Sequence, residues 1–413
     1  MSVSSALVSQ TVSNTDATKD FTSSGFGTPQ VAIVSIVDDI QPTDSTAQHS
    51  VTFFDGTRTR CLAYRDSDGQ ATTSSGHRMS NDECIFYESG SILARFTLSF
   101  ITDGLRLTRV SNNYGSIRVF VTLIKGLDSY RVDHVTPDLT SGNSVATTDP
   151  GFQPDALIFI AARNTFQSGF GTENAHAEIA MGFSTNRDSA IQQTCMNWGS
   201  INGQADSNVY SRLQSDRISG PELFGDDIQE VEVTAYGASG FTITSRSNSG
   251  ASQDHGYIAL KFDAGDGAEI HTGQVPASSG ADTISGLDVA PELVLVTAGL
   301  ASALDTTENA GPDCEPFMFS QFNSSDEFTQ GVESEDNVAT SNTCCFSGSY
   351  AHLTYAGACA LANRASLTSL NSDGWTWNFD TVNQASRYYT SLAIGAEAAA
   401  GRVFDFMPFM PLY

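Results

Sequence analysis

Residues 154–159 read PDALIF, a proline and one polar residue followed by an unbroken apolar run. The same pattern occurs at residues 29–34 (PQVAIV) and at residues 291–296 (PELVLV). A proline is tolerated at the first residue of a strand, where its missing N–H breaks no ladder hydrogen bond, and a continuous apolar run is typical of a strand inside a core. Each of the three segments is therefore predicted to be a buried strand that begins after a proline.

Two further signals follow each of these segments in the same order. The first is a turn into a strand with alternating apolar residues, found at 103–108 (DGLRLT), 239–244 (SGFTIT) and 373–378 (DGWTWN). A period of two places the large apolar side chains on one face of a sheet, and glycine favours the turn conformation. The second is a closing strand, found at 120–124 (FVTLI), 257–261 (YIALK) and 389–393 (YTSLA).

The spacing of these signals along the chain is nearly constant. Gly104, Gly240 and Gly374 precede the leucine of the closing strand by 19, 20 and 18 residues. The opening prolines precede the same leucines by 94, 106 and 101 residues, so the length varies mainly in the connecting loops, where a sandwich tolerates variation. Three signals in one order, three times over, indicate a repeated unit.

The segments between these signals are short and separated by stretches rich in Gly, Ser, Asn, Asp and Thr. Further strands are predicted at 50–56, 59–66, 176–183, 315–322 and 342–349, and no stretch shows a sustained 3.6-residue apolar period. Several short strands in each unit of roughly 100 residues favour two packed antiparallel sheets. We therefore predict an all-β chain of three tandem antiparallel β-sandwich modules, with jelly-roll and immunoglobulin-like topologies both open. The expected modules are residues 1–133, 134–268 and 269–396.

Residues 397–413 lie outside the repeat and end in an apolar segment (GRVFDFMPFMPLY). Such a segment would be a liability if it were free in water. We predict a C-terminal docking tail that is covered either by its own module or by a neighbouring subunit. The residues expected to make the docking contact are Phe404, Phe406, Phe409, Met410 and Tyr413.

The chain is strongly acidic. Its 413 residues include 47 Asp and Glu against 20 Lys and Arg, a formal net charge of -27, and only Lys19, Lys125 and Lys261 are lysines. This charge argues against nucleic acid as a direct partner. At molar salt the Debye length falls to about 3 Å and the self-repulsion is screened, so the composition suits a halophile. The sequence has neither the apolar run of about 18 residues that predicts membrane insertion nor the residue order of a signal peptide.

No motif predicts a catalytic site, a cofactor or a metal. The sequence has no GxSxG, no P-loop and no GxGxxG after a strand, and its histidines show no HxH or HExxH spacing. Its seven cysteines are odd in number and include no CxxC pair. This argues against a zinc ribbon or a simple disulfide framework and predicts mostly buried thiols.

Three other features have both a structural and a functional interpretation. Asp66-Ser67-Asp68-Gly69 is similar to the start of a calcium loop, but the rest of such a loop is absent, so a solvated turn is expected. The pair Asp226-Asp227 could serve glycoside hydrolysis, although any acidic protein offers many such pairs. Trp198, Trp375 and Trp377 could form a sugar-stacking platform, but the last two fall on the apolar face of a strand and are expected in the core.

The middle module carries a resemblance to a known class of proteins. Its Gly151-Phe152-Gln153-Pro154 leads into ALIFIAARN (156–164) and later HAEIAMGF (176–183), and this resembles β-sandwich modules in structural proteins of tailed viruses. The likeness covers most of residues 20–396, although the first and third modules depart from the GF-x-P form. Together with the acidic, arginine-rich composition, the chain resembles a virion protein from a tailed virus of a halophilic archaeon.

The resemblance implies a non-enzymatic homo-oligomer at the particle surface. It would be a turret or decoration protein in contact with the major capsid protein, with outer loops facing solvent or host surface glycans. A tail or baseplate protein that contacts other tail proteins is the alternative within this class. A carbohydrate-binding or glycan-active secreted protein is the alternative from a different class.

Overall fold

The computed structural model describes residues 2–398 except 39–45, 89–90, 114, 170, 188–189, 221, 224–225, 228, 248–252, 308–313 and 358. All regular elements in these residues are β-strands, and their sheets are antiparallel, as the sequence predicts. The described residues contain no helix that is long and apolar enough to span a bilayer.

Three large sheets repeat one strand order. The orders are β1-β10-β3-β4-β5-β6, β11-β22-β13-β15-β16-β17 and β23-β32-β25-β26-β27-β28, and β14 extends the first at the edge formed by β6. The first sheet consists of β1 Ser4–Ser13, β3 Val31–Asp38, β4 Ala47–Phe54, β5 Thr59–Asp66, β6 Ser75–Ser80, β10 Ser116–Lys125 and β14 Asn174–Ala175. The second consists of β11 Leu127–Val135, β13 Ala156–Ala161, β15 Ala177–Arg187, β16 Ala190–Ser200, β17 Val209–Gln214 and β22 His255–Phe262. The third consists of β23 Asp266–Gln274, β25 Val289–Ala298, β26 Cys314–Phe322, β27 Glu327–Glu335, β28 Thr343–Gly348 and β32 Tyr388–Glu397.

A smaller sheet packs on each large sheet and completes a sandwich. The orders of the small sheets are β2-β9-β8-β7, β12-β21-β20 and β24-β31-β30-β29, and β18 pairs with β19 as a separate hairpin. Their strands are β2 Thr18–Thr22, β7 Cys84–Glu88, β8 Ser91–Ile101, β9 Gly104–Asn112, β12 Ser144–Thr147, β18 Glu222–Leu223, β19 Asp226–Asp227, β20 Val231–Gly237, β21 Gly240–Ser245, β24 Gly280–Ile284, β29 His352–Ala356, β30 Ala360–Asn371 and β31 Gly374–Val382. We refer to the three pairs of large and small sheets as sandwiches 1, 2 and 3.

The changeover from one sandwich to the next lies earlier in the chain than the sequence suggests. β11 begins at Leu127 and pairs with β22 in sandwich 2, and β23 begins at Asp266 and pairs with β32 in sandwich 3. The expected module boundaries at residues 133 and 268 therefore fall inside these two strands.

The apolar runs after the prolines are continuous because both faces of these strands are buried. In β3, Ile33 faces a core that all three large sheets share, whereas Val34 faces the small sheet of sandwich 1. The same alternation occurs in the other two sandwiches, since successive side chains of a strand point to opposite faces. The residues facing the shared core there are Ile158, Ile160, Leu293 and Leu295, and those facing their own small sheet are Leu157, Phe159, Val294 and Val296.

Each large sheet is also held at its edge by the neighbouring sandwich. β14, from the loop that follows β13 of sandwich 2, pairs with β6 of sandwich 1. In the same way, Asp305 follows β25 of sandwich 3 and donates its N–H to Leu213 O on β17 of sandwich 2 (2.9 Å). Ala47, at the start of β4, donates its N–H to Thr343 Oγ1 on β28 (3.3 Å). Sandwich 1 thus contacts sandwich 3, and each sandwich contacts both others. The pairing of β14 with β6 covers an edge that would otherwise be open to pairing with other chains.

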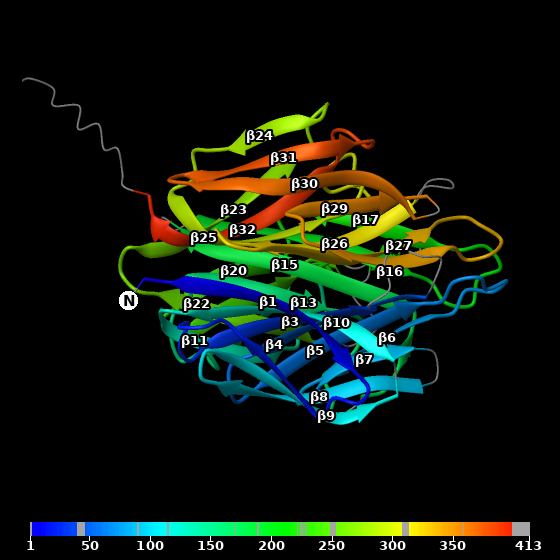
Figure 1. The fold of residues 1–413 in the computed structure, drawn as a ribbon, viewed down its shortest axis with the longest axis horizontal. Helices are drawn as coiled ribbons and strands as arrows, with labels where there is room; N and C mark the ends of the chain where they lie inside the picture. Colours follow the sequence, from blue (N-terminus) through cyan, green and yellow to red (C-terminus); the bar gives the residue numbers. More distant parts are fainter. Residues whose placement is uncertain are drawn as a thin grey trace, which may run out of the picture.

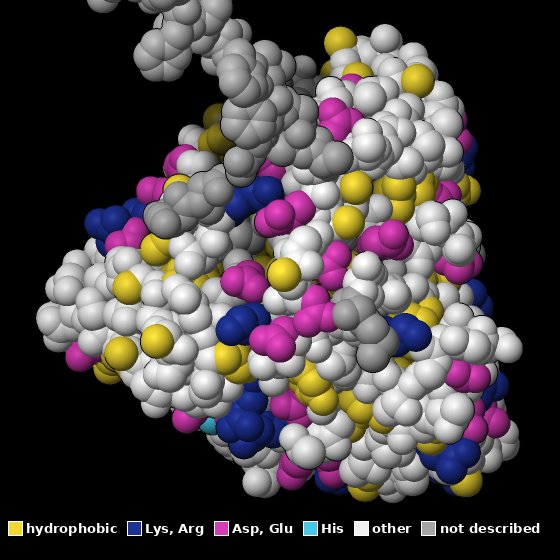
Figure 2. Space-filling view, turned by 90° about the vertical axis from the view of Figure 1, so that its left-hand side faces the viewer, with side chains coloured by type: hydrophobic (Ala, Val, Ile, Leu, Met, Phe, Trp, Pro, Cys, Tyr) yellow, Lys and Arg dark blue, Asp and Glu magenta, His cyan; other side chains and the backbone are white. Residues whose placement is uncertain are grey.

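The three sandwiches form three lobes around the shared core. In Figure 1 the small sheet of sandwich 3 lies at the top and that of sandwich 1 at the bottom. Figure 2 looks at the end where the N-terminus and the last described residues lie, and its outline has three lobes. The chain is thus a closed arrangement of sandwiches and not a linear string.

Two details of the sequence signals have a different physical basis from the one expected. Pro291 lies inside β25 next to a shift of register, a place in a strand where proline is tolerated, and not before the strand. Gly104 and Gly240 do not adopt positive φ, and in the first turn it is Asp103 that does (φ 64°). A Cβ at the three turn glycines would instead collide with a backbone carbonyl of the neighbouring strand or its end. The carbonyls belong to Phe21, Thr147 and Ile284.

Candidate functional site

A cluster of buried aromatic side chains and a histidine lies where the three large sheets meet. At its centre one aromatic side chain from each sandwich meets the others: the ring of Tyr64 lies 5.3 Å from that of Trp198 and 6.2 Å from that of Phe317. The Tyr64 hydroxyl forms a hydrogen bond with His49 Nδ1 (2.9 Å). All four side chains are buried, so this cluster joins the lobes by packing.

Three equivalent turns interlock at one end of this region. They are residues 67–74 between β5 and β6, residues 201–208 between β16 and β17, and residues 336–342 between β27 and β28, and we call them the axial turns. Each pair of axial turns exchanges two backbone hydrogen bonds. The bonds are Gly69 N to Ser341 O (2.8 Å) and Ser341 N to Gln70 O (3.0 Å), Thr73 N to Gln204 O (3.0 Å) and Gly203 N to Thr73 O (2.9 Å), and Ser207 N to Val338 O (2.9 Å) and Asn337 N to Ser207 O (2.7 Å).

The Asp66–Gly69 segment belongs to this junction, and the expected solvated turn is wrong for Asp66 and Ser67, which are buried, whereas Asp68 is half-buried and Gly69 is exposed. Asp66 is buried, and its Oδ2 accepts a hydrogen bond from Ser334 Oγ of sandwich 3 (2.8 Å). Burial raises the pKa of Asp66 to about 6, even though this hydrogen bond acts in the opposite direction. Asp68 Oδ1 accepts from the N–H of Thr343 (3.0 Å). Protein donors therefore engage both carboxylates, and the pair acts as a clasp between sandwiches 1 and 3.

Arginine–carboxylate pairs link sandwiches 1 and 2. Asp133 on β11 pairs with Arg60 on β5 and with Arg58 (Nε to Oδ2, 3.2 Å). Burial works to raise the pKa of Asp133, but the hydrogen bond from His134 and the charges of Arg60 and Arg58 outweigh it and hold this pKa well below its usual range. Glu173, in the loop before β14, pairs in turn with Arg65 (2.7 Å) and Arg78 (3.0 Å). Much of the positive charge of the chain thus serves internal cohesion.

The outer surface is correspondingly acidic. Most described Lys and Arg residues are buried or half-buried, whereas many acidic residues are exposed, and Asp and Glu side chains are spread over the face in Figure 2. The exposed acidic residues include Asp82, Asp128, Asp149, Asp206, Asp216, Asp288, Glu292, Asp305, Asp326, Asp380 and Glu397.

The fold brings His77 and His176, which are far apart in the sequence, into contact, with His77 buried and His176 half-buried. His77 Nδ1 lies 2.7 Å from the carbonyl oxygen of His176, and desolvation lowers the pKa of His77 to about 4. Ser219 Oγ forms a hydrogen bond with His255 Nε2, which is a nucleophile–base pair in residue type. Both residues are fully buried and desolvation lowers the pKa of His255 to about 3, so the pair is enclosed by protein in this conformation.

The tryptophans lie in the core, as expected. Trp198 belongs to the shared core, and Trp375 and Trp377 pack between the sheets of sandwich 3. Asp226 and Asp227 form β19, but their side chains lie outside the described part of the structure. The predicted docking residues Phe404, Phe406, Phe409, Met410 and Tyr413 also lie outside the described residues.

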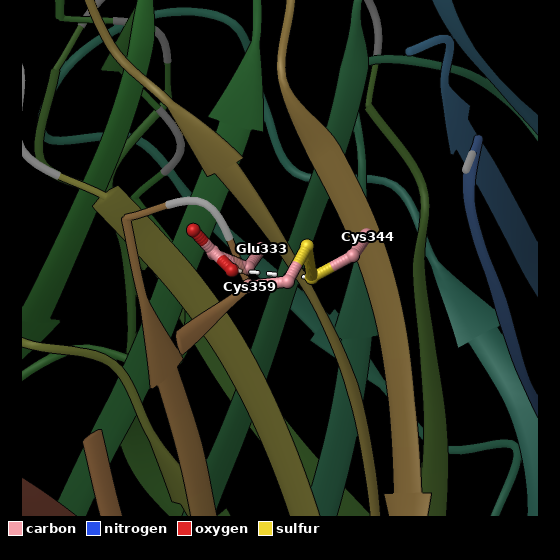
Figure 3. Close-up of side chains that lie close together, drawn as sticks. All are labelled: Glu333, Cys344 and Cys359. Atoms are coloured by element: carbon pink, nitrogen blue, oxygen red, sulfur yellow. Dashed lines mark hydrogen bonds between the residues drawn. A yellow bond between two sulfur atoms is a disulfide. The ribbon is translucent and has the colours of Figure 1, made fainter. Parts of the chain in front are cut away.

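The cysteines are mostly buried thiols, as predicted, but one pair that the sequence did not single out forms a disulfide. Cys344 on β28 and Cys359 in the turn before β30 form a disulfide, with their Cα atoms 6.1 Å apart. The bond joins the large and small sheets of sandwich 3, and the carboxylate of Glu333 points at it (Figure 3). Cys61, Cys84, Cys195 and Cys345 are buried free thiols, as expected. An odd number of cysteines with no local spacing pattern cannot reveal a pair that only the packing of two sheets brings together.

Comparison with known proteins adds no family to these observations. The sequence matches no protein-family model, and no curated protein matches it.

Proposed function

We propose that the chain is a non-enzymatic structural protein of a virion, placed at the particle surface as a turret or decoration protein. The observation that carries this proposal is the shared core, through which three sandwiches form one closed, three-lobed unit. In this arrangement the buried apolar residues hold lobes together, and the loops at the outside of each lobe remain available for contacts.

The geometry suits a symmetric particle. Large assemblies are built around rotation axes, and their components meet at those axes through repeated contacts. A single chain with three similar lobes offers three similar surfaces to its surroundings, so one copy can occupy a position that a trimer would otherwise fill. The resemblance of the middle module to structural proteins of tailed viruses supports the same role.

The charge distribution favours a protein that works in concentrated salt. Among the described residues nearly all exposed charged side chains are acidic, while guanidinium groups such as those of Arg60 and Arg65 are engaged in buried or half-buried pairs. Exposed like charges repel one another at low ionic strength, and salt screens them. The acidic surface therefore supports a halophilic host, and it supports a protein partner such as the major capsid protein.

Labelled particle imaging tests the proposal. An antibody against the folded chain, visualised on purified particles, should mark clusters on the capsid at a fixed copy number. Label confined to the tail would instead support the tail or baseplate role. Protein that stays out of the particle fraction and turns over glycans would contradict the virion role and favour the secreted carbohydrate-active alternative.

A further inference from the structure

The Cys344–Cys359 disulfide of sandwich 3 lies against the buried carboxylate of Glu333. Glu333 and Cys344 are directly opposite each other on β27 and β28, so their side chains share one face of the large sheet. Cys359 reaches them from the small sheet, out of a turn in which it adopts a φ of 55°. Glu333 Oε2 lies 3.1 Å from Cys344 Sγ (Figure 3).

The protonation state of the sulfur matters at this distance. A thiol can donate a hydrogen bond to a carboxylate, but a disulfide sulfur has no proton to donate. Glu333 is 1% exposed and Cys344 is fully buried. In the disulfide form Cys344 therefore donates no hydrogen bond to Glu333, whereas reduction would supply a thiol donor, or two thiolates that could share a cation with the carboxylate.

The three groups are arranged as a metal-binding set. One oxygen of Glu333 and the sulfurs of Cys344 and Cys359 all lie within 4.8 Å of one another. In a tetrahedral zinc site with Zn–S near 2.3 Å and Zn–O near 2.1 Å, such donors are about 3.6–3.8 Å apart. Two thiolates and a carboxylate are also a donor set that zinc accepts, with water able to fill the fourth position. Small movements of two side chains therefore suffice.

We propose that reduction converts the Cys344–Cys359 disulfide into a site for a divalent cation of the zinc type, held by the two thiolates and the carboxylate of Glu333. Cys359 is half-buried whereas Cys344 is fully buried, so Cys359 is the end of the disulfide at which an external reductant would attack. With a phosphine, the sulfur–sulfur bond receives two electrons, and water supplies the oxygen of the phosphine oxide and the two protons of the thiols. Binding of the cation then releases two protons, one from each thiol. This inference is independent of the proposed virion role.

Cobalt(II) is the probe that tests the site, because thiolate ligands give it a charge-transfer absorption in the near ultraviolet. The full-length chain, reduced with a phosphine under exclusion of oxygen, should bind one cobalt ion with this absorption, and zinc should displace it. The same preparation without reductant should show no such signal. This comparison needs no substitution, so it remains valid whatever the variants do to folding.

Variants then assign the ligands. Cys359→Ser should abolish the absorption, and Glu333→Gln should weaken cobalt binding at least tenfold while leaving the thiolate absorption at saturation. The double variant Cys61→Ser/Cys84→Ser removes two buried thiols of sandwich 1 and should leave the signal unchanged. The proposal is overturned if reduced protein shows no thiolate absorption, if the absorption survives in Cys359→Ser, or if the oxidised protein binds cobalt equally well.

Discussion

Replacing His352 with phenylalanine should remove part of the acid sensitivity of the fold. His352 lies on β29 inside sandwich 3, with its ring 5.6 Å from that of Phe379 and 5.9 Å from that of Trp377. Neither ring nitrogen has a hydrogen-bond partner among the described residues. Desolvation lowers the pKa of His352 from 6.5 to about 3.

The size of the effect follows from this difference in pKa. The unfolded chain takes up a proton at His352 as the pH falls below 6.5, whereas the folded chain does so only near pH 3. The stability contributed by the neutral ring is therefore complete above pH 6.5 and is lost progressively between pH 6.5 and pH 3. At pH 4.5 this loss is about 3 kcal/mol, since each pH unit is worth about 1.4 kcal/mol. A phenylalanine at this position takes up no proton and loses nothing.

Urea unfolding followed by tryptophan fluorescence, at pH 7.5 and at pH 4.5 in the same salt, measures the effect. The free energy of unfolding should fall between the two pH values by about 3 kcal/mol less in His352→Phe than in the unchanged protein. Phe379→Leu, which removes a ring from the same cluster but no titrating group, should lower stability equally at both pH values. An identical pH dependence in His352→Phe and the unchanged protein would refute the reasoning.

Three further predictions concern the junctions and the surface. Gly240→Ala should destabilise the fold by more than about 2 kcal/mol because the new Cβ would collide with the Thr147 carbonyl oxygen. Gly237→Ala, in the same hairpin, has free space for its Cβ and should change stability by less than about 0.5 kcal/mol. Equal effects of the two variants on urea unfolding would contradict this. Burial raises the pKa of Asp66 from 3.8 to about 6, so the cost of ionising this carboxyl group in the folded chain builds up between pH 3.8 and pH 6 and is complete above pH 6. Asp66→Asn should therefore raise the free energy of unfolding by about 3 kcal/mol at pH 8 and leave it unchanged below pH 4. A gain that does not change with pH would rule out this cause. Raising potassium chloride from low to molar concentration should raise the melting temperature by several degrees, and a fold equally stable on dialysis to low salt would count against a halophilic origin.

The sequence predicts the strands well because their signals are local. The alternation in DGWTWN places Trp375 and Trp377 on one face, and the structure confirms that both are buried together. The apolar run 154–159 likewise corresponds to β13, whose continuous hydrophobicity reflects burial on both faces. Such patterns depend only on the geometry of a single strand.

The sequence does not predict the junctions between sandwiches because their signals are not local. The turn that begins at Asp66 reads like any acidic turn, and only the neighbouring turn that contains Ser341 makes it a clasp. The same holds for the pairing of Cys344 with Cys359, which depends on how two sheets pack. The sequence does contain one signal of the axial turns: a turn rich in Gly, Ser, Asn or Asp recurs between the last two strands in the order of each large sheet. The composition of a turn, however, does not reveal which other turn it contacts.

Calorimetry tests most directly whether the three sandwiches are one folding unit joined by the shared core and the axial turns. We predict a single heat-absorption peak in molar potassium chloride, with a calorimetric enthalpy equal to the van't Hoff enthalpy. Separate peaks, or a calorimetric enthalpy about three times the van't Hoff value, would mean that the sandwiches unfold independently and would contradict the account.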